Sequence, residues 1–189
     1  MGLFDILKGN TKLPKANLDE LFKLPGATIT LEINANLTPS GKGAVCYKPA
    51  SGAAFENTVA EYQSVLDSMT DSNTTYTTST DSYGYDWVVI SDPSIESLTT
   101  AIHAVNRSLE DHGFAQALLC SAFRFDDQKV SQPVYWIYMY KRGTFYPFVP
   151  TGPSSRNNER ELTLKAIIGT DLPVEPDLAS WMAPWGLPL

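Results

Sequence analysis

The side chains best suited to nucleophilic or metal chemistry in this sequence are two cysteines and two histidines: Cys46, Cys120, His103 and His112. The histidines are nine positions apart in one predicted helix, so they project from opposite sides of its axis and do not converge on one metal. The cysteines are 74 residues apart, and each sits among apolar residues of a predicted strand. No zinc-type spacing of ligands is present. We therefore expect buried free thiols, no disulfide framework, and no metal or cofactor.

Two other motifs could carry chemistry. Gly41-Lys42-Gly43 resembles the start of a phosphate loop, but it lacks the G-x-x-x-x-G-K-S/T frame and leads into a predicted strand instead of a helix. A turn explains it better. No G-x-S-x-G elbow occurs, and no carboxylate cluster stands apart from ordinary helix surface. A nucleophilic Cys–His pair that comes together only in the folded chain is the one alternative left by the sequence. Apart from it, we expect no enzymatic activity.

Composition narrows the class of protein. The chain has 189 residues, 43% of them hydrophobic, a net charge of −7 and a pI near 4.7, which favours a single domain and disfavours nucleic-acid binding. No apolar run is long enough to span a membrane. The start of the chain has no signal-peptide pattern, so we expect a cytoplasmic protein. Apolar residues at positions 3–7 could make weak peripheral contact with a membrane, although docking on the protein itself is favoured.

Periodicity predicts the elements that would position these residues. An N-terminal helical segment over residues 1–26 contains a short helix from about 17 to 25. Strict alternation then predicts a half-buried strand over 29–37, followed by a turn at 39–43 and a second strand at 44–48.

The remaining elements follow in the same way. Helical spacing of apolar residues predicts helices over 53–69, 94–113 and 157–168, and the predicted strands are 74–81, 85–90, 117–125, 134–141 and 144–149. The predicted order is α-ββ-α-ββ-α-βββ-α. This order indicates one α+β domain over residues 1–189, with an antiparallel sheet built from successive hairpins and helices packed on it. The tail, residues 169–189, contains four prolines and two tryptophans and is expected to pack on the body.

The most conspicuous segment is residues 135–148, which holds seven of the 21 aromatic residues. Because successive strand residues face opposite sides, one aromatic set can be core while the other faces outward and needs a covering helix, the tail or a partner. We take five residues of this segment as candidates for partner binding: Tyr138, Tyr140, Lys141, Arg142 and Tyr146. Residues 142–148 also match part of an RNA-binding strand motif, but Thr144, Pro147 and the acidic charge disfavour RNA.

Several stretches together resemble the PspAB family, proteins associated with the phage-shock protein A membrane-stress scaffold. They are MGLFD at 1–5, GKGAVCYKP at 41–49, AVNRSLED at 104–111, YWIYMYKRGTFYPF at 135–148, LPVEPD at 172–177 and WGLPL at 185–189. The resemblance covers nearly the whole chain. It implies a small cytoplasmic partner in a PspA-type envelope-stress system, with no known enzymatic activity.

Three hypotheses follow. In the first, the protein is a non-enzymatic adaptor that docks a helix of a PspA-like coiled-coil scaffold, or of its regulator, on the five candidate residues. In the second, it has a secretion-chaperone-like or YbjN-like fold and binds extended peptides, usually as a homodimer; this rests on the order of elements alone. In the third, it is a small-ligand binder or an enzyme of unknown chemistry that uses a cleft near the Lys141-Arg142 turn.

Overall fold

The structure is a computed structural model that describes residues 17–69, 73–130 and 132–189. Its centre is a six-stranded antiparallel sheet in the order β2-β3-β1-β4-β5-β6. The strands are β1 (Leu37–Tyr47), β2 (Thr75–Thr80), β3 (Asp86–Ser91), β4 (Leu118–Asp127), β5 (Pro133–Met139) and β6 (Thr144–Phe148). Two short strands, β7 (Pro150–Gly152) and β8 (Ser155–Arg156), form a separate ribbon. The predicted α+β class with an antiparallel sheet is confirmed.

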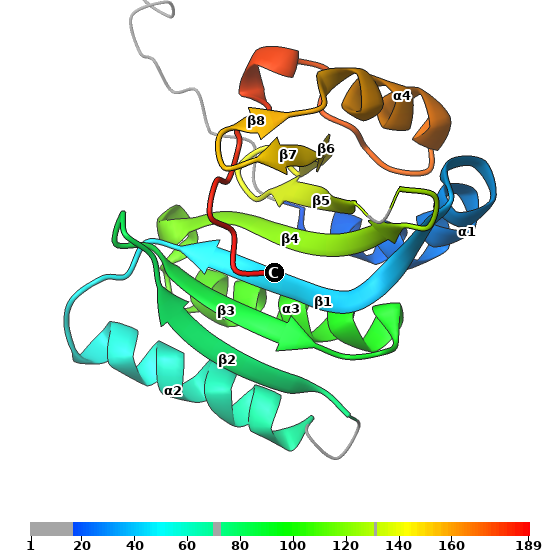
Figure 1. The fold of residues 1–189 in the computed structure, drawn as a ribbon. Coiled ribbons are helices and arrows are strands. Elements are labelled where there is room, and N and C mark those ends of the chain that lie inside the picture. Colours follow the sequence, from blue (N-terminus) through cyan, green and yellow to red (C-terminus); the bar gives the residue numbers. More distant parts are fainter. Residues whose placement is uncertain (1–16, 70–72, 131) are drawn as a thin grey trace, which may run out of the picture.

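Four α-helices accompany the sheet within the described residues: α1 (Lys23–Ala35), α2 (Ala53–Ser68), α3 (Ile95–Asp111) and α4 (Asn158–Ile168). The helical predictions over 53–69, 94–113 and 157–168 are confirmed. Helix α3 lies across one face of the sheet (Figure 1) and approaches β1 so closely that a Cβ on Gly43 would lie 2.6 Å from Ile102 Cδ1. This close approach explains the glycine at that position.

The prediction of a strand over 29–37 is wrong, because residues up to Ala35 form helix α1. Alternating apolar residues suggested a strand, yet only part of that set is buried. The buried residues follow a helical spacing: Leu24, Ala27, Thr28, Leu31 and Ala35. In contrast, Ile29 and Ile33 are 64% and 74% exposed. Asn36 then takes a left-handed conformation, with φ of 58°, and ends the helix.

The predicted turn at 39–43 does not join two strands. It is an irregularity within the single long strand β1, where the pairing with β4 shifts between Pro39 and Lys42. Gly41 has φ of 74° at this irregularity. The sheet is therefore not made only of successive hairpins, because β1 lies between β3 and β4, far from either in sequence.

The two faces of the sheet are covered by different parts of the chain. The larger core lies between the sheet and the helices, and contains Trp136, Tyr138 and Phe145 of the aromatic segment. On the opposite face, Ile137 and Tyr146 pack beneath residues of the C-terminal tail, including Trp181 and Trp185. Figure 1 shows this tail crossing the face that α3 does not cover, with the C-terminus lying over β1.

Candidate functional site

The structure separates the five residues that the sequence suggested for partner binding. Tyr138 and Tyr140 are buried on the helix side of the sheet, where the Tyr138 hydroxyl donates a hydrogen bond to the Asn17 carbonyl at 2.9 Å. Tyr146 is buried on the opposite side and stacks on Trp181, with 5.9 Å between ring centroids. The expectation of one exposed aromatic patch is therefore wrong. The tyrosines belong to two separate cores, one beneath the helices and one beneath the C-terminal tail.

Burial also holds these three tyrosines in their neutral form. It raises the pKa of Tyr140 to about 12, and the neighbouring Glu110 carboxylate adds to the effect. Burial likewise raises the pKa of Tyr138 and Tyr146 well above the ordinary value. None of the three is therefore poised to act as a base near neutral pH.

Lys141 and Arg142 are exposed in the turn between β5 and β6, but they differ in what they do. The Arg142 guanidinium lies 2.9 Å from a carboxylate oxygen of Glu175, which is buried, and 3.8 Å from one of Asp177. Arg142 therefore fastens the start of the tail to the turn between β5 and β6. Lys141 makes no hydrogen bond or ion pair with any residue in the described ranges. Of these two side chains, only that of Lys141 has no ion-pair partner among the described residues.

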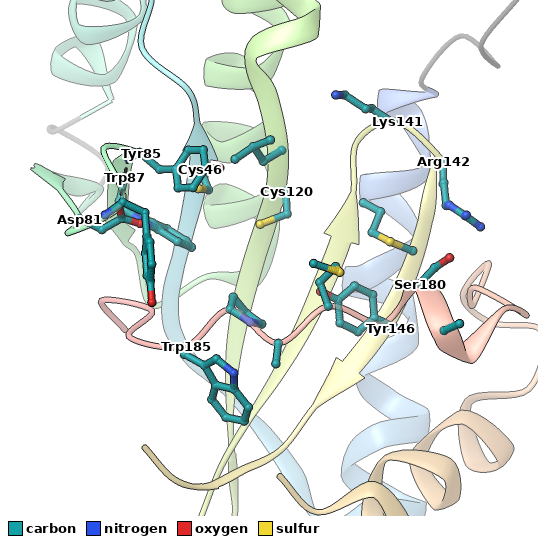
Figure 2. A pocket seen from close by; sticks show the side chains of 17 residues that line it. Cys46, Asp81, Tyr85, Trp87, Cys120, Lys141, Arg142, Tyr146, Ser180 and Trp185 are labelled. Atoms are coloured by element: carbon teal, nitrogen blue, oxygen red, sulfur yellow. Dashed lines mark hydrogen bonds between the residues drawn. The ribbon is translucent and has the colours of Figure 1, made fainter. Parts of the chain in front are cut away.

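Lys141 stands at the edge of a pocket of about 690 Å³ on the tail side of the sheet. Figure 2 shows Cys46, Cys120 and Tyr146 projecting from the strands, Tyr85 and Trp87 on one side, and Trp185 on the tail that passes over the sheet. Met139 and Met182 also line the pocket. The lining is thus largely aromatic and sulfur-containing, with cationic side chains at one end.

One wall is the turn between β2 and β3, which Asp81 organises. Its carboxylate accepts hydrogen bonds from the backbone N–H of Tyr83 and Tyr85, at 2.8 and 3.0 Å, and from Trp87 Nε1 at 3.0 Å. Burial by itself would raise the pKa of Asp81, but these hydrogen bonds outweigh it and hold the pKa below its ordinary value. Asp81 therefore positions Trp87 and is not a free base.

The other wall is the C-terminal tail, which is held by its own polar contacts. The backbone N–H of Glu175 donates a hydrogen bond to the Phe145 carbonyl, and Thr144 Oγ1 donates one to the Glu175 carboxylate at 2.9 Å. Further along, Trp181 Nε1 donates to the Glu175 carbonyl, and Arg156 Nη1 donates to the Trp181 carbonyl at 2.9 Å. The bonds from Phe145, Thr144 and Arg156 attach the tail to the rest of the domain, so the tail forms a fixed wall of the pocket.

The cysteines meet on the pocket floor, which sequence reasoning did not foresee. Cys46 of β1 and Cys120 of β4 are directly opposite each other in the antiparallel register. A hydrogen bond with the Cys120 thiol, followed by burial, raises the pKa of Cys46 far above its ordinary value. The sequence indicated only that both cysteines lie in predicted strands. It did not predict that these two strands pair, because they are far apart in the chain and neither segment by itself specifies its neighbour.

The histidines lie elsewhere. Both belong to the α3 region on the helix side of the sheet: His103 packs on the Phe22 ring, at 4.8 Å between centroids, and His112 Nε2 lies 3.0 Å from Glu61. The sheet therefore separates both histidines from the thiols, and no Cys–His pair forms. Over residues 17–69, 73–130 and 132–189, no group of three or more His, Cys, Asp or Glu residues is arranged to hold a metal ion.

Three comparisons with known proteins bear on the identity of the chain. The family model for PspA associated protein B matches residues 1–189, the whole chain. Neither a search of curated proteins nor a search of solved structures finds a match. Among the helices of the described residues, none is sufficiently long and apolar to cross a membrane.

Proposed function

The chain belongs to the PspA associated protein B family, and from this membership we propose that it is a non-enzymatic accessory protein that binds a PspA-type coiled-coil scaffold, or a regulator of it, in an envelope-stress response. The observation that carries the proposal is the apolar pocket with the exposed side chain of Lys141 at its edge. This surface replaces the aromatic patch that the sequence suggested, and it keeps Lys141 as its charged element.

The chemistry of the pocket suits an apolar side chain presented by a helix. A helix offers apolar residues at intervals of three and four positions, and an apolar groove with aromatic walls is a recurring receptor for such a stripe. Trp87 and Trp185 are the kind of rigid aromatic residue on which binding energy concentrates. Because the chain carries a net charge of −7, its overall field does not attract an acidic partner, so Lys141 would supply a local, orienting contact with a partner carboxylate.

The direct test reverses this charge. We expect Lys141→Glu to weaken binding of the purified PspA-type scaffold from the same host by roughly tenfold, and to change the salt dependence of binding, because a rim cation becomes a repulsive anion. Isothermal titration calorimetry at two salt concentrations measures both effects. Arg142 is left intact, since its replacement would loosen the tail as well as change the surface.

Lys129→Glu is the matched control, because Lys129 is also exposed but lies in the turn between β4 and β5, at the opposite end of β5. It should bind like the unaltered protein. Equal affinity of the Lys141→Glu protein and the control would remove this surface from the proposal. Cross-linking in the host, with and without envelope stress, tests the wider claim: recovery of no PspA-type scaffold in either condition, with unfolded or exported clients instead, would favour the chaperone-like homodimer.

A small-ligand binder is the second candidate, and the pocket itself favours it. Its volume of about 690 Å³ lies within the range of small-molecule sites. The pocket adjoins the Lys141-Arg142 turn, where the ligand-binding hypothesis predicted a cleft. Native mass spectrometry of protein purified from its host distinguishes the candidates, because a retained small molecule would support the ligand-binding function.

A further inference from the structure

The two cysteines lie opposite each other on neighbouring strands, and both line the pocket described above. We propose that Cys46 and Cys120 are a reactive dithiol that closes to a cross-strand disulfide on reaction with a small disulfide such as oxidised glutathione, and that a thiol reductant reopens it. The proposal rests on the register of β1 and β4, on the access that the pocket provides, and on the different burial of the two thiols.

Register places the pair within bonding range. Directly opposed residues of antiparallel strands have Cα atoms roughly 4.5–5.5 Å apart. Disulfide-bonded cysteines have Cα atoms at roughly 4.4–6.8 Å, so the spacing of directly opposed residues falls within the range that the bond needs. Their side chains lie on the same face of the sheet, where Cys120 packs against the apolar cluster that contains Cys46 and both residues line one pocket. They are the only cysteines in the chain, so neither has another intramolecular partner.

The pocket provides the route for the oxidant. Both cysteines line it, and its volume is sufficient for a small molecule. Cys120 is half-buried, whereas Cys46 is only 3% exposed and has its pKa raised by the hydrogen bond and by burial. Since the thiolate is the nucleophile, Cys120 is the thiol that meets the incoming disulfide, and Cys46 is the one that resolves it.

The reaction is two successive thiol–disulfide exchanges. The Cys120 thiol loses its proton to solvent, and its sulfur attacks one sulfur of the oxidant; a mixed disulfide forms, the oxidant's S–S bond breaks and one small thiolate leaves. The Cys46 thiol then loses its proton, its sulfur attacks Cys120 Sγ and the second small thiolate leaves. The two protein thiols are oxidised by two electrons, the small disulfide is reduced to two thiols, and the released protons are taken up by the leaving thiolates.

The test uses the full chain, oxidised glutathione and intact-mass spectrometry after acid quenching. We expect a transient glutathione adduct that peptide mapping places on Cys120, followed by a monomer that has lost two hydrogens, resists alkylation and is restored by dithiothreitol. Cys46→Ser should stop at the mixed disulfide on Cys120, lengthening its lifetime by at least roughly tenfold, because the resolving thiol is missing. Cys120→Ser should leave Cys46 at least roughly tenfold slower to react than Cys120 in the unaltered protein.

A probe that bridges two thiols without oxidising them checks proximity separately. One molecule of phenylarsine oxide should protect both cysteines of the unaltered chain from alkylation and bind neither single variant tightly. Near-ultraviolet circular dichroism verifies that both serine variants are folded. Four outcomes would overturn the inference: two glutathione adducts on one chain, a disulfide between chains, thiols that react only in denaturant, or no protection by the arsenical.

Discussion

Replacing Glu161 by alanine is expected to lower the free energy of unfolding by about 3–5 kcal/mol, which is a large part of the stability of a domain this size. Glu161 is 2% exposed, and both carboxylate oxygens accept hydrogen bonds from Arg156 Nε at 2.9 Å. One of these oxygens also accepts the Val149 N–H at 2.8 Å. Removal of the carboxylate would leave a largely buried guanidinium and a buried N–H without their acceptor. Urea unfolding followed by tryptophan fluorescence measures the loss.

Glu159→Ala is the matched control for this prediction. Glu159 lies in the same first turn of α4 but is exposed, so its loss should cost about 1 kcal/mol or less, mainly through the helix dipole. Glu161→Gln, which keeps the shape and one acceptor oxygen, should fall between the two alanine variants. Equal midpoints for Glu161→Ala and Glu159→Ala would contradict a stabilising role for the buried ion pair.

Replacing Trp181 by alanine is expected to detach the tail wall of the pocket. The Trp181 ring is 8% exposed, stacks on Tyr146, and carries the Lys165 ammonium 5.7 Å from its centroid. Truncation of a packed tryptophan costs about 3–5 kcal/mol of stability, and it also removes the Nε1 hydrogen bond to the Glu175 carbonyl. We expect a lower unfolding midpoint together with faster proteolysis within residues 176–189, measured by limited digestion and mass spectrometry.

Leu178→Ala is the corresponding control, because Leu178 lies in the same tail but is exposed. It should change neither the midpoint nor the digestion rate appreciably. If the Trp181→Ala tail were digested no faster than the Leu178→Ala tail, the tail would be held by its polar contacts alone, and the stacking on Tyr146 would not be what closes the pocket.

The losses of stability caused by Glu161→Ala and by Trp181→Ala should not be additive. Arg156 joins them physically, because its Nε bonds to Glu161 while its Nη1 bonds to the Trp181 carbonyl, and its guanidinium lies 5.0 Å from the Phe148 ring centroid. Residues that share a partner usually show coupling energies of about 0.5–3 kcal/mol. A double-mutant cycle of Glu161→Ala and Trp181→Ala should therefore give a combined loss smaller than the sum of the single losses.

Local patterns in the sequence determined the elements whose apolar residues follow a single period. Helices α2 and α3, and the strands of the aromatic segment, were predictable because their spacing matches only a helix or only a strand. Helix α1 was not, since its apolar residues satisfy both periods and the choice depended on which of them meet a core. Burial of Leu31 and exposure of Ile29 decided it, and burial is a property of the packed chain.

In the candidate site, too, the sequence determined some features and the tertiary structure decided the others. From the sequence alone, the aromatic segment, its basic turn and a packed tail with two tryptophans were evident, and alternation indicated that its aromatics face two sides. Alternation does not say which side is covered or by what. Only the tertiary structure buried Tyr138 under helices and Tyr146 under Trp181, left Lys141 exposed in its turn, and placed Cys46 opposite Cys120. These relations join segments far apart in the chain, and their formation depends on the whole core, which no local pattern encodes.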